Sequence, residues 1–240
     1  MNSNGNFVYF ITEGATERRV GLVLYNRKLL AGAQPKPGLI GLSREGYNTV
    51  INEMHKQKVL QALEGAPGVG LLLIFDQEGA KRPKDRTNEI EKELKLSFHP
   101  IRDCGHDNVF ETQKGRLKIV LHISNAAAKG ITNRDFDGYI LNLLQGPYKK
   151  KIAKELANGQ NYIELLKKSE EEMTNLMQRN HYPWSHNKSW IYAYITAFQF
   201  RKSHVWFAEE VVKKAPKKAL REVFSSLIDA WNWLVKGECR

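Results

Sequence analysis

The sequence contains few cysteines and no long apolar segment. Only two cysteines, Cys104 and Cys239, occur among its 240 residues. Two cysteines this far apart provide neither a zinc site of the usual spacing nor a disulfide framework. The longest apolar run, Val69 to Phe75, is much shorter than the roughly 20 residues that span a bilayer. The polar start of the chain also lacks the features of a signal peptide. We therefore expect a protein of the reducing cytoplasm, without a membrane partner.

Negative charge is in the minority. The chain has 37 Lys and Arg against 26 Asp and Glu, so its formal net charge is +11. This balance favours DNA, RNA or another polyanion as a partner, although a basic protein without such a partner remains an alternative. The sequence also lacks a Gly-rich phosphate loop ending in Gly-Lys-Ser or Gly-Lys-Thr. An associated ATPase or sensor would therefore be a separate protein chain.

Strand and helix patterns alternate in the first half of the chain, whereas the second half is helical. This alternation predicts an α/β fold with a mainly parallel sheet flanked by helices, and an all-helical C-terminal extension. The expected strands are 7–12, 39–42, 69–75 and 117–123. The expected helices are 47–63, one from 85 or 87 to about 96, 136–144, 148–157, 162–177, 188–200, 205–213 and 217–234, preceded by one that starts near Thr16. We expect an α/β core over residues 1–130 and a helical extension over 131–240, packed on the core as a second domain or as part of one compact unit.

Two pairs of acidic residues follow two apolar strands. Glu13 and Glu17 follow the first strand, and Asp76 and Glu78 follow the strand 69–75. If these strands are neighbours in a parallel sheet, their carboxyl ends bring the acids together, and a divalent cation would relieve the repulsion. Alternatively, Glu17 complements the positive end of a helix, and the other acids are solvated.

These residues resemble a known family. The segments 12–17 (TEGATE) and 74–78 (IFDQE) resemble the two acidic motifs of the TOPRIM domain. That domain occurs in topoisomerases, bacterial primases, a ribosomal RNA maturation nuclease and the overcoming-lysogenization-defect nucleases. The resemblance implies a TOPRIM-like fold and chemistry on phosphodiesters with bound metal. The family has Asp-x-Asp in its second motif, whereas this chain has Asp-x-Glu.

Two later segments resemble the small nucleases of this group. Residues 120–125 with 135–141 resemble the strand and acidic helix start of those enzymes, and 186–194 resemble the segment that carries their catalytic lysine. The resemblance implies that Asp137 binds metal and that Lys188 is catalytic. Equally, Asp135 or Asp137 could cap a helix, and Lys188 could be a solvated lysine at a helix start.

Together these observations predict a nuclease that cleaves DNA or RNA with Mg²⁺ or Mn²⁺. We expect Glu13, Asp76 and Lys188 to be catalytic. The expected metal ligands are Glu13, Glu17, Asp76, Glu78 and Asp137. The expected nucleic-acid contacts are Lys81, Arg82, Lys84, Arg86, Lys213, Lys214, Lys217 and Lys218. Alternatively, the first four solvate a loop and the last four a helix face. Relatives suggest a role in defence against phage. The alternative is a non-catalytic module that binds nucleic acid or protein within a larger complex.

Overall fold

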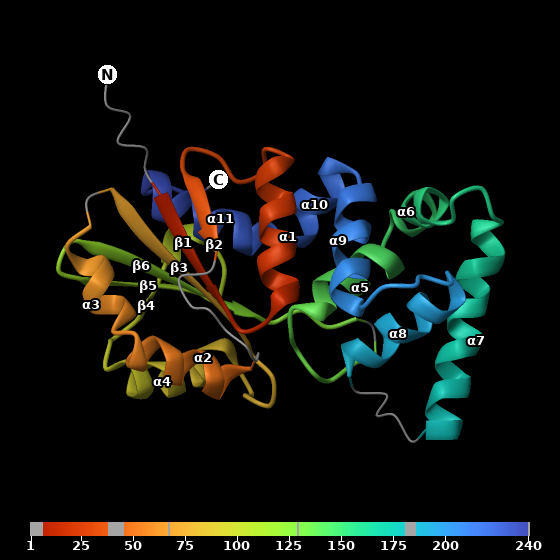
Figure 1. Cartoon of the computed structure of the whole chain (residues 1–240), viewed down its shortest axis with the longest axis horizontal. Coiled ribbons are helices and arrows are strands. Elements are labelled where there is room, and N and C mark those ends of the chain that lie inside the picture. Colours follow the sequence, from red (N-terminus) through yellow and green to blue (C-terminus); the bar gives the residue numbers. More distant parts are fainter. Residues whose placement is uncertain (1–6, 38–45, 67, 129, 181–185, 240) are drawn as a thin grey trace. The chain divides into compact units, whose positions relative to one another are not determined.

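The chain forms two compact units. The computed structural model describes residues 7–37, 46–66, 68–128, 130–180 and 186–239 (Figure 1). Unit 1 consists of the described residues of Met1–Ser124 and Ser225–Arg240, and unit 2 consists of those of Asn125–Phe224. Unit 2 is therefore an insertion in the sequence of unit 1. The expected boundary near residue 130 places the last helix in the helical extension, whereas the structure places it in unit 1.

Unit 1 is built on a six-stranded sheet of order β2-β1-β3-β6-β5-β4. Strands β2, β1, β3 and β6 are parallel, and β5 and β4 run antiparallel at one edge. The strands are β1 (Phe7–Thr12), β2 (Gln34–Pro37), β3 (Val69–Asp76), β4 (His99–Pro100), β5 (Val109–Lys114) and β6 (Leu117–Ser124). The predicted α/β class with a mainly parallel sheet is confirmed.

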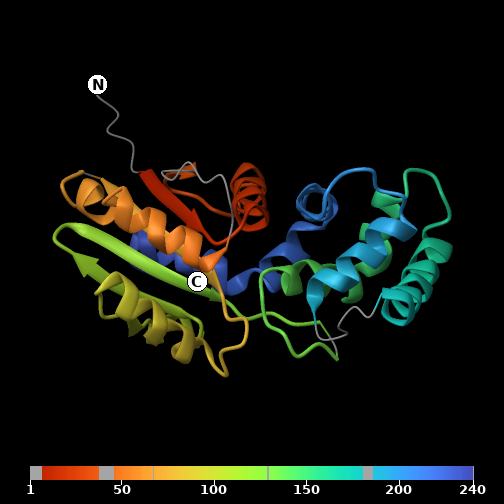
Figure 2. The same ribbon diagram turned by 60° about the horizontal axis from the view of Figure 1, so that its bottom comes forward.

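Helices cover both faces of this sheet (Figures 1 and 2). Helices α1 (Ala15–Asn26) and α11 (Ser225–Lys236) lie on one face, where the ring of Trp231 stacks on Phe10 at 5.4 Å. Helices α2 (Tyr47–Lys56), α3 (Val59–Glu64) and α4 (Pro83–Leu94) lie on the other face. The main apolar core lies between the sheet and these three helices. Its sheet side consists of Ile11, Leu71, Leu73, Phe75, Phe110, Leu117, Ile119, Leu121 and Ile123.

The C-terminal segment is tied to the rest of unit 1 by a hydrogen bond and a disulfide. The indole N–H of Trp231 donates to the carbonyl of Ala31 at 2.8 Å. Cys239, just after α11, forms a disulfide with Cys104 of the short helix η1 (Arg102–Cys104), with their Cα atoms 5.1 Å apart. This disulfide was not expected from the sequence. The two cysteines are 135 residues apart, and the sequence does not show that α11 packs back on the sheet near Cys104. The cysteines therefore give no support to a reducing compartment.

The regular elements described in unit 2 are helices, together with an isolated bridge between Ala126 and Asp135. Its helices are α5 (Asp137–Gln145), α6 (Lys149–Leu156), α7 (Tyr162–Asn180), α8 (Asn187–Ala197), α9 (His204–Lys214) and α10 (Lys217–Val223). The ring of Phe224 packs against the rings of Phe136 and Tyr139. Across the described residues of both units, no helix is both long and apolar enough to cross a membrane.

Several expected elements differ from the structure. The strand expected at 39–42 lies outside the described residues, and the strands β2, β4 and β5 were not expected. The single helix expected over 47–63 is wrong, because Lys58 adopts a left-handed conformation (φ 50°) that separates α2 from α3. Likewise, the helix expected over 217–234 is divided into α10 and α11 at Phe224.

Candidate functional site

The two acidic strand ends meet in unit 1. Strands β1 and β3 are parallel neighbours, with Thr12 opposite Ile74. The ladder continues beyond β1, because the N–H of Glu13 donates to the carbonyl of Ile74 at 3.0 Å. The Glu13 carboxylate (Oε2) in turn accepts the backbone N–H of Asp76 at 3.1 Å. Residues 63 positions apart in the sequence thus share a hydrogen bond at the carboxyl edge of the sheet.

The side chains of Glu13 and Asp76 start from opposite faces of this sheet. Successive side chains of a strand alternate between its faces. Glu13 continues the row of Ile11, which packs under α2 and α4. Asp76 continues the row of Gly70, whose face lies against Leu234 of α11. The backbone of Asp76 therefore reaches Glu13, whereas its carboxylate leaves the strand on the other side.

A buried arginine accompanies Glu13. The side chain of Arg86, in α4, is 9% exposed, and its Nη2 lies 3.8 Å from Oε2 of Glu13. Its Nε donates to the carbonyl of Asp76 at 3.0 Å, and its Nη1 donates to Glu89 at 2.8 Å. The guanidinium lies 3.9 Å from the ring centroid of Tyr47. The structure therefore places Arg86, which was expected to contact substrate phosphates, in buried contact with Glu13 and the backbone of Asp76.

Burial is the largest influence on Glu13. Burial raises the pKa of the Glu13 carboxyl above its usual value, and the charge of Glu78 raises it further. The backbone N–H groups of Asp76 and Tyr47 and the charge of Arg86 act in the opposite direction. Because Tyr47 begins α2, the carboxylate also lies at the positive end of a helix. Glu13 is thus a buried acid that its surroundings only partly compensate.

The other two acids of this edge, Glu17 and Glu78, differ in how exposed their side chains are. Glu17, in the first turn of α1, is buried, and its carboxylate oxygen would lie 2.9 Å from a Cβ at Gly14. The side chain of Glu17 therefore folds back over the turn that follows Glu13. Glu78 is exposed and adopts φ 47°. Among the described residues, no group of three or more His, Cys, Asp or Glu side chains is placed to hold a metal ion.

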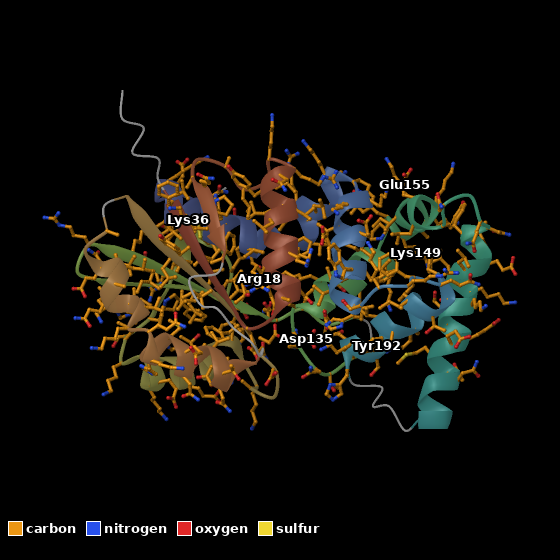
Figure 3. All side chains as sticks on the ribbon, in the orientation of Figure 1. Arg18, Lys36, Asp135, Lys149, Glu155 and Tyr192 are labelled. Carbon is orange, nitrogen blue, oxygen red and sulfur yellow. A yellow bond between two sulfur atoms is a disulfide. The ribbon has the colours of Figure 1, made fainter. Side chains whose placement is uncertain are left out.

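A second acidic cluster lies within unit 2. Asp135, just before α5 (Figure 3), accepts the N–H of Gly138 at 3.0 Å and the side-chain amide of Asn187 at 2.8 Å. Its other oxygen accepts the side-chain amide of Asn133 at 3.0 Å. Asp135 therefore satisfies a backbone donor in the first turn of α5, which is the capping role that the sequence left open. The same contacts join the start of α5 to the start of α8.

Asp137 and Lys188 lie within electrostatic range of each other. The pKa of Asp137 is raised to about 7, mainly by burial and then by the charge of Asp135, while the charge of Lys188 lowers it. Lys188 also lowers the pKa of Asp135. A Cβ at Gly138 would collide with the carbonyl of Ala126, so only glycine allows this close approach. The structure thus brings the expected residues Asp137 and Lys188 together within unit 2.

The expected nucleic-acid contacts fall into two groups. In unit 1, Lys81 is exposed, Arg82 pairs with Asp85 at 3.0 Å, and Lys84 pairs with Glu91 at 3.2 Å. In unit 2, Lys213 pairs with Glu209 and Glu210, at 2.7 and 3.0 Å. Lys214, Lys217 and Lys218 are exposed near the end of α9 and the start of α10. The exposed lysines remain available to a polyanion.

Sequence reasoning missed Asn187 as the side chain that joins α5 and α8. Its Oδ1 accepts the N–H of Ala128 at 3.3 Å, and its Nδ2 donates to Asn133 and Asp135. Its position directly before Lys188 was the available signal.

Comparisons with protein-family models, curated proteins and solved structures find no match to this chain.

Proposed function

We propose that this protein is a nuclease of the TOPRIM type that cleaves phosphodiester bonds of DNA or RNA with Mg²⁺ or Mn²⁺. The observation that supports this proposal most strongly is the hydrogen bond between Glu13 and the backbone of Asp76, at the carboxyl ends of adjacent parallel strands. Ligands of open α/β sheets bind at this edge. The net charge of +11 favours a polyanionic substrate.

Carboxylate oxygens are the ligands that Mg²⁺ prefers. Glu13, Glu17, Asp76 and Glu78 are the carboxylates that would hold the ion in unit 1. Because the side chain of Asp76 starts from the other face of the sheet, it would have to turn around the end of β3 to join Glu13. The bound ion would generate the attacking hydroxide and neutralise charge on the phosphate oxygens. We assign to Asp137 a further metal-binding carboxylate, and to Lys188 the orientation of water or the stabilisation of developing negative charge.

Cleavage assays test this proposal directly. Labelled single- and double-stranded DNA and RNA would be incubated with the full chain and Mg²⁺, Mn²⁺ or EDTA. We expect metal-dependent cleavage that Glu13→Ala and Asp76→Ala reduce at least a hundredfold. Glu155→Ala, which removes an exposed acid of α6, should leave the rate unchanged. The absence of cleavage, or equal rates in all variants, would overturn the proposal.

A non-catalytic binding module is the second candidate, and Arg86 favours it. A guanidinium 3.8 Å from Glu13 already supplies positive charge where a metal ion would otherwise be needed. The Asp-x-Glu departure from the family motif points the same way. Such a module would bind nucleic acid, or a separate ATPase or sensor chain, as a subunit of a larger complex. A place in phage defence is compatible with either candidate.

Calorimetric titration with Mn²⁺ separates the two candidates. A nuclease should bind Mn²⁺, and Glu13→Ala and Asp76→Ala should abolish that binding. A binding module should bind nucleic acid equally well with EDTA present, without cleavage. If Lys214, Lys217 and Lys218 contact phosphates, its affinity should also fall steeply with salt.

A further inference from the structure

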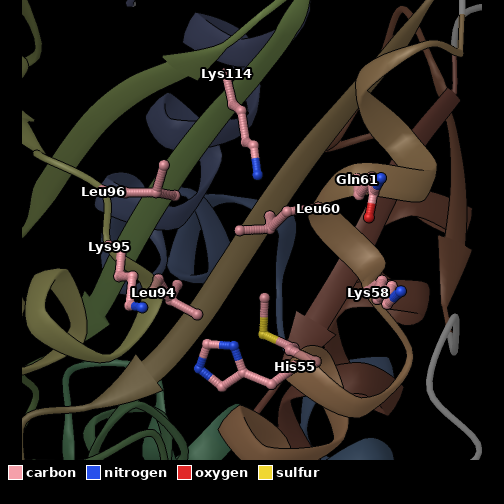
Figure 4. Close-up of a pocket in the computed structure, with 9 residues that line it drawn as sticks. His55, Lys58, Leu60, Gln61, Leu94, Lys95, Leu96 and Lys114 are labelled. Atoms are coloured by element: carbon pink, nitrogen blue, oxygen red, sulfur yellow. The ribbon is translucent and has the colours of Figure 1, made fainter.

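A basic cavity lies in unit 1, away from the acidic edge of the sheet. Its volume is about 530 Å³, within the usual range of small-molecule sites. The side chains of Lys58, Lys95, Lys114 and His55 line it (Figure 4). None of the described residues that line it is acidic. The concentration of positive charge in a concave site indicates an anionic ligand.

The remaining wall of this cavity is largely aliphatic. Leu60 of α3, Leu94 of α4 and Leu96 surround its centre (Figure 4), and Met54, a member of the apolar core, also lines it. Leu60 and Leu96 are only partly buried, so they offer apolar surface to a ligand. A cationic rim above an aliphatic wall fits a molecule with an anionic group at one end and an apolar body at the other.

Two of the three lysines occupy unfavourable backbone conformations. Lys58 (φ 50°) stands between α2 and α3, and Lys95 (φ 53°) ends α4. Glycine is the usual residue in such left-handed positions, particularly at the end of a helix. Strained residues are concentrated at functional sites. Lysine at both positions is consistent with a role for the two ammonium groups.

This cavity is distinct from the Glu13 site. Arg86 lies in the first turn of α4 and Lys95 follows its last residue. Their separation of nine residues corresponds to roughly 13 Å along the helix axis. Arg86 contacts Glu13, and Lys95 lines the cavity. The ligand of the cavity can therefore be assigned without reference to the proposed nuclease function.

We propose that this cavity binds an organic phosphate of the size of a nucleoside monophosphate. Lys114, whose side chain points toward the centre of the cavity, would bind the phosphate, and Lys58 and Lys95 on opposite sides would add positive potential around it (Figure 4). The leucine side chains would contact the base and the sugar. Three lysines favour the doubly charged phosphate over a singly charged carboxylate.

Calorimetry on the full chain with four probes tests the proposal. The probes are adenosine 5′-monophosphate, adenosine, inorganic phosphate and octanoate. We expect the nucleotide to bind at least tenfold more tightly than each of the other three. Equal affinity for adenosine, tighter binding of octanoate, or no binding of the nucleotide would overturn the proposal.

A pair of matched variants locates the site. Lys95→Gly and Lys28→Gly each remove one positive charge from an exposed lysine of unit 1 with positive φ (53° and 59°), but Lys28 does not line the cavity. Both variants should raise Tm, because glycine relieves the backbone strain. Only Lys95→Gly should weaken nucleotide binding, by about tenfold. Equal weakening in both variants would indicate nonspecific attraction and contradict the site.

Discussion

At the residue scale, the protein buries carboxylates whose surroundings compensate only part of the cost of burying their charge. Glu13 is 6% exposed, and among the described residues backbone N–H groups and the guanidinium of Arg86 offset the cost of its burial. Asp137 lies beside the charge of Asp135. Perturbed carboxyl groups of this kind are common at functional sites, although structural ion pairs produce them as well.

Removing Arg86 tests how far Glu13 depends on it. We expect Arg86→Met to lower the free energy of unfolding of unit 1 by about 3 kcal/mol, because a buried charge loses its partner. The loss should be smaller in a Glu13→Gln background, since glutamine carries no charge. Urea unfolding of the two single variants and the double variant measures this coupling. Strictly additive effects would show that the two side chains do not interact.

The raised pKa of Asp137 predicts that the stability of unit 2 depends on pH. Its pKa of about 7 lies above the value of 3.8 for an ordinary aspartate, so protonated Asp137 stabilises the folded state. This contribution is complete below pH 3.8 and is lost as the pH rises through 7. At roughly 1.4 kcal/mol per pKa unit, the full shift would correspond to about 4 kcal/mol of unfolding free energy. Because Asp137 is only partly buried, we expect about half of this, about 2 kcal/mol.

The measurement is the difference in unfolding free energy between wild type and Asp137→Asn, without added metal, from pH 4.5 to 8. Asparagine cannot ionise, so the variant should gain stability relative to wild type as the pH rises. A difference that is constant across this range would show that Asp137 titrates outside it.

At the element scale, neighbouring elements approach closely where glycine omits a side chain. A Cβ at Gly70 of β3 would lie 2.9 Å from Cγ of Leu234 in α11. In α1, a Cβ at Gly21 would lie 3.3 Å from the ring of Phe10. These contacts bring α1 and α11 onto the face of the sheet from which the side chain of Asp76 starts.

Gly70→Ala should therefore separate α11 from β3. We expect a loss of about 1–2 kcal/mol in unfolding free energy, as is typical of overpacking. Gly65→Ala is the matched control, because no atom lies within 4 Å of its added Cβ and its φ is −91°. Thermal unfolding of both variants provides the comparison. Equal stability would mean that α11 adjusts without cost.

The sequence predicted the elements whose signal is local. Strands β1, β3 and β6 are apolar runs and were expected within one or two residues. Strand β2 contains Pro35 and Pro37, which read as breakers, but proline is tolerated because this strand is at the edge of the sheet. The left-handed turn at Lys58 has no local signature, since glycine would be the usual residue there.

The candidate site was predictable to the same extent. The proximity of Glu13 and the Asp76 backbone follows from the rule for the ends of parallel strands. The contact between Arg86 and Glu13 depends on how α4 packs on the sheet, and no spacing along the chain encodes that packing. Similarly, the hydrogen bond from Asn187 to Asp135 joins residues 52 positions apart.

At the scale of the whole molecule, the disulfide joins two residues of unit 1 between which the whole of unit 2 is inserted in the sequence. A crosslink between Cys104 and Cys239 closes a loop of 135 residues. Such crosslinks stabilise chiefly by restricting the unfolded chain. We expect reduction, or Cys239→Ser, to lower the stability of unit 1 by about 2–4 kcal/mol.

Thermal unfolding with and without a reductant measures this effect. The double variant Cys104→Ser and Cys239→Ser is the control, and it should be insensitive to the reductant. A wild-type protein whose Tm does not change on complete reduction would contradict the expected contribution.

The position of α11 in the sequence also determines when the α/β unit can be completed. A ribosome finishes all of residues 125–224 before it synthesises α11, which covers one face of the sheet and buries Trp231 against Phe10. Until then, the apolar side chains of that face have no cover from this helix. The nascent chain is thus expected to fold its inserted helical unit first. Its need for chaperones should be greatest before α11 is synthesised, while one face of the sheet is still exposed.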